Sequence, residues 1–378
     1  MTTTRAGLRA AVLLGILGAA CCAATGCGDG GGRRAGAAGA PHFVPATWEG
    51  GELRNGALAV THGGVGSPRD WSPDCQVAAD QALAALRAGA PALDAAVAGT
   101  IVLEDNPRLN AGTGANIRLD GRTIQMDAAV MASDGRFGAV AVIERVRNPI
   151  AVARTLLNTP HLLLAGEGAT RFAHAAGFAD EVPSSPEAET KYRQRVAQLL
   201  AGRGGEGFDT FDWRRYWNFP EPLPAWLRAP ATAGSGGATA DRPPAPAGRW
   251  DTVGTVARDA EGGFAASLST GGTSLTLHGR VGDVPIYGAG CFAGPAGAVA
   301  CTGYGEQIIR HGMARLVYAL LERGLPAREA VRRGIALFPP EHSLGLIAVG
   351  RTGWGVAANR VMACGKSAVA SGDTIVAR

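Results

Sequence analysis

The spacing of hydrophobic residues divides the chain into short strands and grouped helices. Residues 52–64 are mainly apolar and end at a Gly-Gly turn, which is typical of a strand. Apolar residues over 75–89 recur at helical spacing, and Ser72 is the expected N-cap of that helix. A second helix over 91–105 is almost entirely apolar, which predicts burial on most faces.

Strands and helices continue in groups towards the middle of the chain. The runs 117–131 and 135–146 alternate in polarity, and Asp120-Gly121 in the first run predicts a hairpin turn. Three further helices are expected over residues 150–157, 169–176 and 187–201.

The last third has the same mixed pattern. Residues 251–259 and 262–272 read as a strand pair, and 343–359 reads as two more strands. A single long helix is predicted over 306–322. Because the helices are grouped and do not alternate strictly with strands, the pattern favours an α+β fold of packed sheets covered by helices over a doubly wound parallel sheet.

Composition permits a large core and gives no nucleic-acid signature. The chain has 378 residues, of which 46% are hydrophobic. Its net charge of +4 is spread along the sequence, without a basic stripe interleaved with aromatic residues. No glycine-rich phosphate-binding motif lies between a strand and a helix.

The N-terminus reads as an export signal. Residues 1–27 combine early arginines with a short apolar run that is too short to span a membrane. The sequence before Cys27 resembles a lipobox, which predicts lipidation of Cys27; a plain cleavable signal is the alternative. Residues 28–50 are expected to form a flexible tether. The protein is therefore expected to be periplasmic or a membrane-anchored bacterial lipoprotein.

The remaining cysteines match no zinc-binding pattern, and we expect no metal ligands among them. An exported protein could pair them, but their small and apolar neighbours favour buried free thiols. They are Cys75, Cys291, Cys301 and Cys364.

A proline- and glycine-rich stretch at 229–249, predicted to be disordered, directly precedes Thr252. A threonine hydroxyl needs an adjacent base, and a free α-amino group has a suitable pKa. Thr252 would gain that group if the Asp251–Thr252 peptide bond were cleaved. This hypothesis divides the mature chain into segments 51–251 and 252–378. The alternative is an ordinary β-branched residue that opens a strand.

Other polar residues downstream could complete such a site. Thr270 ends the paired strand and could return beside Thr252 as a second hydroxyl. Arg280 and Asp283 could hold the carboxylate and ammonium groups of an amino acid. An ordinary surface ion pair is the alternative for these two residues.

Two glycine-rich turns could stabilise an oxyanion. The Thr302 hydroxyl and the Gly303 amide are potential donors in a turn that enters a helix. Asn110, in the sequence NAGTG, could hold a water or a donor nearby. Each turn could equally be structural.

An ordered series of motifs resembles the plant-type asparaginase and isoaspartyl peptidase family, which are N-terminal-nucleophile hydrolases related to glycosylasparaginase. The motifs run over about residues 52–360 and are HGG, LEDNPRLNAGTG, MDAAVM, RVRNPIAVAR, HLLLAGEGA, DTVG, STGG, GRVGD and TGYGE. The resemblance implies a four-layer αββα sandwich that cleaves itself before the nucleophile. It also implies a dimer of cleaved αβ units that needs no cofactor, and in some members a structural sodium ion on carbonyls of the loop before Asn110.

The resemblance assigns roles to the residues named above. Thr252 matches the nucleophile, Thr270 the supporting threonine, Arg280 and Asp283 the substrate clamp, Thr302 and Gly303 the oxyanion side, and Asn110 an accessory position. The implied substrates are small molecules, namely L-asparagine and β-aspartyl dipeptides.

The sequence departs from the family pattern in three places. Tyr304 replaces a usual histidine, Val284-Pro285 follows GRVGD where Ser-Pro is usual, and VMACGKS replaces the usual ending. These differences bear on side-chain selectivity. Glycosylasparaginase is the nearest alternative, although STGG and NAGTG argue against it. A non-cleaving protein that keeps the fold and binds an aspartyl group is the other.

Overall fold

The computed structural model describes residues 45–204, 211–228 and 252–370. These residues belong to one unit of the chain, which starts at Phe43. The predicted signal, Cys27, Asp251 and the 229–249 linker lie outside the described residues.

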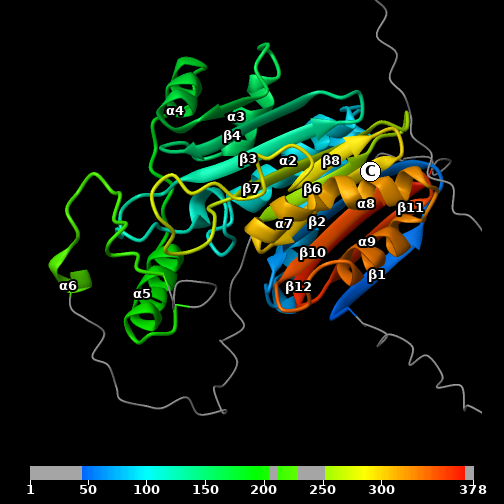
Figure 1. Ribbon diagram of the computed structural model, residues 1–378. Helices are drawn as coiled ribbons and strands as arrows, with labels where there is room; N and C mark the ends of the chain where they lie inside the picture. Colours follow the sequence, from blue (N-terminus) through cyan, green and yellow to red (C-terminus); the bar gives the residue numbers. More distant parts are fainter. Residues whose placement is uncertain (1–44, 205–210, 229–251, 371–378) are drawn as a thin grey trace, which may run out of the picture. The chain divides into compact units, whose positions relative to one another are not determined.

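Two sheets form the centre of the described part of the chain (Figure 1). The larger has the spatial order β12 (Met362–Ala370), β2 (Gly56–Val65), β6 (Val253–Arg258), β7 (Phe264–Thr270), β3 (Met126–Ala132), β4 (Phe137–Ile143) and β5 (Leu163–Ala165). The smaller has the order β1 (Thr47–Glu52), β11 (Gly353–Ala358), β10 (Leu344–Gly350), β9 (Gly297–Gly303) and β8 (Cys291–Gly294). Of these strand pairs, only β4 and β5 run parallel.

Helices pack on both sheets. On the larger sheet, α1 (Ser72–Arg87) and α2 (Ala92–Glu104) contact β2 and β6 respectively, and α3 (Pro149–Leu156) contacts β3 and β4. On the smaller sheet, α8 (Met313–Glu322) contacts β9, and α9 (Ala327–Ala336) contacts β10 and β11. The other described helical segments are η1 (Arg69–Trp71), η2 (Gly112–Gly114), α4 (Gly166–Ala175), α5 (Pro186–Leu200), α6 (Ala225–Arg228) and α7 (Gly305–His311). The predicted α+β class is confirmed.

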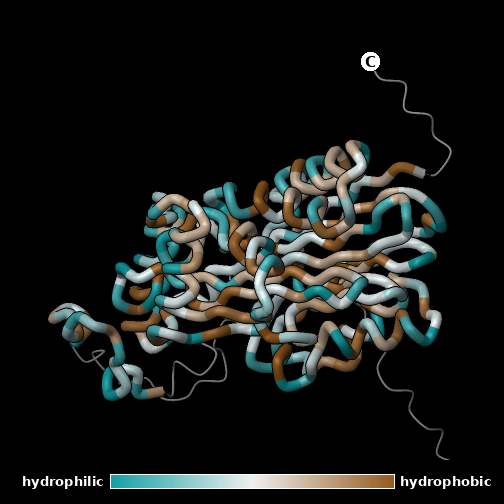
Figure 2. Tube along the Cα trace, turned by 90° about the horizontal axis from the view of Figure 1, so that it is seen from above, coloured by the Kyte–Doolittle hydropathy of each residue, from teal (hydrophilic) through white to brown (hydrophobic). Residues whose placement is uncertain are grey.

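The main apolar core lies between the two sheets. It joins residues such as Leu58 and Val256 of the larger sheet to Ala300 and Ile347 of the smaller one. Strands β6 and β7 are buried at every position, because both faces of the sheet are covered. Figure 2 shows the hydrophobic segments running through the packed strands, with hydrophilic segments at the outer turns. No helix within the described ranges is long and apolar enough to cross a membrane.

Most of the predicted elements are present, with local differences. The single helix expected over 306–322 is two helices, α7 and α8, because Gly312 adopts the left-handed conformation with φ 53° and ψ 49°. Ser72 is the first residue of α1, and Trp71 occupies the N-cap position without a side-chain cap bond.

Two further predictions were wrong in part. Asp120-Gly121 does form a turn, in which the Asp120 carboxylate accepts bonds from two backbone amides, but no long hairpin follows. The strand β3 pairs with β4 and β7 instead. Residues 47–50, expected in the flexible tether, belong to β1, which pairs with β11.

The cysteine prediction is confirmed for the four residues predicted to be free thiols. Cys75, Cys291, Cys301 and Cys364 are all free, and the first three are buried. Burial raises the pKa of the Cys291 and Cys364 thiols to about 12.

Candidate active site

Thr252 directly precedes β6, a central strand of the larger sheet. Its exposed fraction is 1%. Strand β6 lies between β2 and β7, with Val253 opposite Ser269 and Gly254 opposite His62. The sheet therefore fixes the position of Thr252 through both neighbouring strands.

His62 on β2 is a neighbour that the sequence did not identify as part of the site. A Cβ at Gly254 would lie 2.8 Å from its Nε2 atom, so only glycine fits at that position. Burial lowers the pKa of His62 to about 3, although the backbone of Thr252 acts in the opposite direction. The imidazole is therefore neutral near pH 7 and adds no charge beside Thr252.

Thr270 ends β7 next to the start of β6. Since Val253 is opposite Ser269, one further residue along each strand brings Thr252 and Thr270 to neighbouring positions. Thr270 is 2% exposed, and its hydroxyl oxygen accepts a bond from the Gly272 amide at 3.0 Å. The structure thus brings the two predicted threonines together.

Asn110 holds the turn that follows Thr270. Its Nδ2 donates to the Gly272 carbonyl at 2.8 Å, and its own carbonyl accepts from the Gly271 amide at 3.0 Å. The Asn116 amide donates to Asn110 Oδ1 at 2.9 Å. In this arrangement Asn110 positions the turn after Thr270; the prediction that it holds a water or a donor near the oxyanion stays a prediction.

Arg280 and Asp283, the predicted substrate clamp, lie close to Gly305. A Cβ at Gly305 would lie 2.9 Å from Asp283 Oδ1 and 3.0 Å from Arg280 Nη2. Asp283 is 3% exposed. The guanidinium of Arg280 donates to Glu306 Oε1, from Nε at 3.1 Å and from Nη2 at 2.9 Å.

A buried arginine and a buried aspartate near the predicted clamp were missed by sequence reasoning. Arg118 is completely buried, and its Nη2 donates to the Arg280 carbonyl at 3.3 Å. Burial lowers the pKa of Arg118 to about 10, and Asp127 opposes that effect. Burial raises the pKa of Asp127, whose carboxylate accepts from the Val142 and Gly282 amides. The arginine within IRLDGRT has no motif that distinguishes it from a surface arginine.

Thr302 and Gly303 end β9 on the smaller sheet, where the sequence predicted a turn. Strand β9 contacts β6 and β7 across the interface between the sheets. The Thr302 hydroxyl oxygen accepts from the Val65 amide at 3.2 Å. Gly303 has φ 143° and packs against the Ser343 carbonyl, which leaves no space for a side chain.

The loop before Asn110 carries backbone oxygens of the kind that bind sodium. A Cβ at Gly112 would lie 2.5 Å from the Glu104 carbonyl oxygen, and one at Gly114 would lie 2.6 Å from that of Pro107. These carbonyls point towards the same short η2 segment. The described residues hold no cluster of three or more His, Cys, Asp or Glu side chains suited to a metal.

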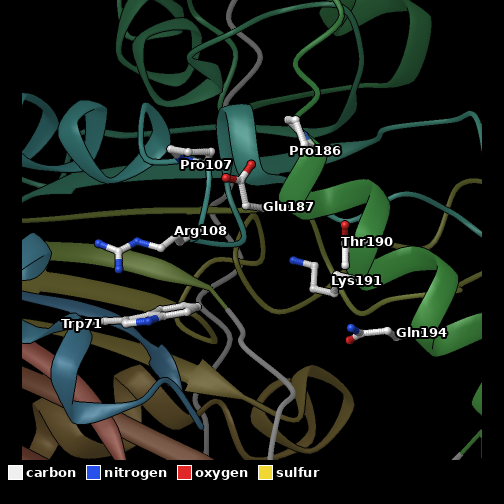
Figure 3. Close-up of a pocket in the computed structure, with 8 residues that line it drawn as sticks. All are labelled: Trp71, Pro107, Arg108, Pro186, Glu187, Thr190, Lys191 and Gln194. Atoms are coloured by element: carbon white, nitrogen blue, oxygen red, sulfur yellow. The ribbon is translucent and has the colours of Figure 1, made fainter.

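A cavity of about 430 Å³ lies beside the same loop. Figure 3 shows Trp71, Pro107 and Arg108 on one side of it and residues of α5 on the other. Its lining residues are Trp71, Pro107, Arg108, Pro186, Glu187, Thr190, Lys191 and Gln194. None of the predicted site residues lines this cavity.

Comparisons with known proteins identify the family. A family model described as asparaginase matches residues 60–375. The chain belongs to the plant-type asparaginase and isoaspartyl peptidase family. The matched segment includes residues 60–65 of β2, the Asn110 loop, Thr252, Arg280 and Asp283, so the family likeness covers the predicted site residues.

The relatives of this chain are named for three different enzyme activities. The plant-type L-asparaginase of Pyrococcus furiosus is 37% identical, over 69% of this chain and 78% of the relative. The isoaspartyl peptidase of Escherichia coli is 36% identical, over 79% of this chain and 88% of the relative. The N(4)-(β-N-acetylglucosaminyl)-L-asparaginase of Elizabethkingia miricola is 31% identical, over 66% of this chain and 62% of the relative.

Proposed function

We propose that this chain is a hydrolase that cleaves L-asparagine and β-aspartyl dipeptides through an N-terminal threonine nucleophile. The observation that carries the proposal is the arrangement of β6 and β7. It sets Thr252 and Thr270 side by side at the strand ends, while Gly305 packs against both clamp residues.

The chemistry needs a free amino group on Thr252. Scission of the Asp251–Thr252 bond, with Asp251 outside the described residues, would supply it. The α-amine then accepts the proton of the Thr252 hydroxyl, and Oγ attacks the side-chain carbonyl of the substrate. The Thr302 hydroxyl and the Gly303 amide stabilise the negative oxygen of the tetrahedral intermediate.

The second half of the reaction releases aspartate. The proton held by the α-amine passes to the departing ammonia or amine, which leaves a β-aspartyl ester on Thr252. Water then attacks this ester, giving its proton to the amine, and the Thr252 hydroxyl is restored as aspartate leaves. Arg280 and Asp283 bind the aspartyl carboxylate and ammonium groups.

The same family membership supports a finer description of the fold. We assign the four-layer αββα sandwich of N-terminal-nucleophile hydrolases, supported by two sheets in mutual contact and helices on each. A sodium ion at the Glu104–Gly114 loop would brace the backbone there and take no part in the bond-breaking steps. The Glu104 and Pro107 carbonyl oxygens, which lie close to η2, support this assignment.

Denaturing gel electrophoresis with N-terminal sequencing tests the proposed activation. Wild-type protein should give two fragments, the second starting at Thr252, and Thr252→Ala should stay intact and inactive. Thr252→Ser retains a hydroxyl and should cleave itself more slowly. A single intact band with full activity on β-aspartyl amides would contradict the proposal.

A panel of substrates then distinguishes between the alternative activities and the non-cleaving protein. L-Asparagine, β-aspartyl-leucine and a glycosylated asparagine should be compared by kcat/KM. We expect the first two to be hydrolysed. Preference for the glycosylated substrate would instead favour the glycosylasparaginase reading, and binding of aspartate without any hydrolysis would favour the non-cleaving protein.

Export, lipidation at Cys27 and a dimer of cleaved units also remain proposals. They are supported by the apolar run within residues 1–27 and by the family resemblance. Membrane fractionation of wild type and Cys27→Ser would test the anchor, and light scattering of the purified protein would test the dimer.

A further inference from the structure

Glu306 makes a specific contact with the clamp that the family motif alone does not explain. Its Oε1 atom accepts two bonds from Arg280, from Nε at 3.1 Å and from Nη2 at 2.9 Å. The Arg280 side chain is 16% exposed and that of Glu306 is 42% exposed. The pair is therefore more shielded than an ordinary surface ion pair, particularly on the arginine side.

The backbone places Glu306 in this position. Gly305 packs so closely against Asp283 and Arg280 that a side chain there would collide with both. Glu306 is the next residue, in the first turn of α7. The end of β9 and the start of α7 thus carry an oxyanion donor, a close-packed glycine and the carboxylate that holds Arg280, within four consecutive residues.

The local charge explains why Arg280 needs such a partner. The buried Arg118 donates from Nη2 to the Arg280 carbonyl at 3.3 Å. Burial is the main cause of the lowered pKa of Arg118, and repulsion between the two arginines acts in the same direction. Asp127 attracts both arginines, and its two carboxylate oxygens accept bonds from the backbone amides of Val142 and Gly282. A long arginine side chain also loses rotamer entropy when it is fixed. The Glu306 carboxylate attracts the Arg280 guanidinium against the repulsion from Arg118, and it fixes the Arg280 side chain before substrate binds.

We propose that Glu306 is a positioning residue that fixes the Arg280 guanidinium for the α-carboxylate of the aspartyl substrate. This inference rests on the proposed function, because it assumes that Arg280 binds that carboxylate. Glu306 itself neither attacks nor transfers a proton. Its effect should appear in substrate affinity, equally for all substrates that share the aspartyl group.

The test compares Glu306→Ala and Glu306→Gln with the control Glu322→Ala. Glu322 forms an exposed ion pair with Arg315 at 2.8 Å and lies away from the clamp contacts. Glu306→Ala should raise KM about tenfold for both L-asparagine and β-aspartyl-leucine, with a smaller change in kcat. Glu306→Gln keeps an acceptor oxygen and should fall between wild type and Glu306→Ala. Glu322→Ala should leave both constants unchanged.

A binding measurement separates this inference from the proposed reaction. L-Aspartate has no side-chain amide to hydrolyse, so calorimetry can compare its binding to wild type and to Glu306→Ala, and the variant should bind it about tenfold more weakly. That result would support the positioning role even if no amide substrate were hydrolysed. Unchanged or tighter aspartate binding in Glu306→Ala, or no aspartate binding by wild type, would overturn the inference.

Discussion

Glu104 is a fully buried carboxyl group close to the turn that carries Thr270. Its Oε1 accepts from the Ile150 amide at 3.0 Å. Burial raises the pKa of Glu104 to about 8, and hydrogen bonds from Ser269, Ile150 and Asn148 oppose that effect only in part. Ser269 is adjacent to Thr270, so the protonation state of Glu104 is coupled to the strand that supports the site.

The sign of its effect on stability follows from that pKa. A carboxyl whose folded pKa lies above the unfolded value stabilises the protein at low pH, and this stabilisation is lost as pH rises from about 4.5 through about 8. Between about pH 6.5 and pH 8, the loss from Glu104 should be about 2 kcal/mol of unfolding free energy. Glu104→Gln should remove this part of the pH dependence in urea unfolding, since the amide stays neutral.

His62 does not disturb this comparison. Its folded pKa is lowered to about 3, so its contribution is present above about 6.5 and is lost as pH falls towards 3. The two pH ranges overlap between about 4.5 and 6.5, but above about pH 6.5 only the Glu104 contribution still changes. Equal pH dependence in wild type and Glu104→Gln over pH 6.5–8 would show that Glu104 is already ionised in the folded protein.

At the scale of the secondary-structure elements, the turn after β7 has no space for a side chain at Gly271. A Cβ at Gly271 would lie 2.6 Å from Asn110 Oδ1 and would also collide with the Asn116 amide. Gly271→Ala should therefore displace Asn110 or the turn, and lower kcat at least tenfold by moving Thr270. Steady-state kinetics with β-aspartyl-leucine measures this effect.

Gly168 on α4 provides the matched control. A Cβ there meets no atom within 4 Å, and alanine is favoured over glycine within a helix. Gly168→Ala should leave kcat unchanged and keep or slightly raise thermal stability. A similar loss of kcat in both variants would mean that the effect of Gly271→Ala does not come from the turn after β7.

Sequence reasoning located most elements, because β6, β7, α1 and α2 have clear periodic patterns. It failed where one residue's backbone conformation decided the outcome, as at Gly312 between α7 and α8. It identified the site residues that lie in glycine-rich motifs, such as Thr270 and Gly303. It missed Arg118, Asp127 and His62, since their importance depends on burial and on partners far away in the chain.

At the scale of the whole molecule, β1 closes one edge of the smaller sheet. It pairs with β11 along its full length, and the Trp48 ring lies 4.1 Å from the Arg328 guanidinium carbon. A variant lacking residues 1–44 should keep the melting temperature of the mature protein. A variant lacking 1–52 should melt several degrees lower and aggregate more readily, because it exposes the edge of β11.

Differential scanning calorimetry and light scattering measure these two outcomes. The shorter deletion is the control for loss of the N-terminal segment itself. If both variants melted alike, β1 would contribute no stability to the sheet.

The order of strands in the larger sheet affects whether the cleaved enzyme can refold after it is unfolded. Strands β2 and β3 come from before Thr252, and they hold β6 and β7, which come from after it. A cut before Thr252 would leave two polypeptides interleaved, so neither could depart while the sheet persists. Once melted, however, each would have to find the other again in solution. We expect maturation to be a one-way event, with heat-inactivated enzyme regaining activity poorly and in a concentration-dependent manner.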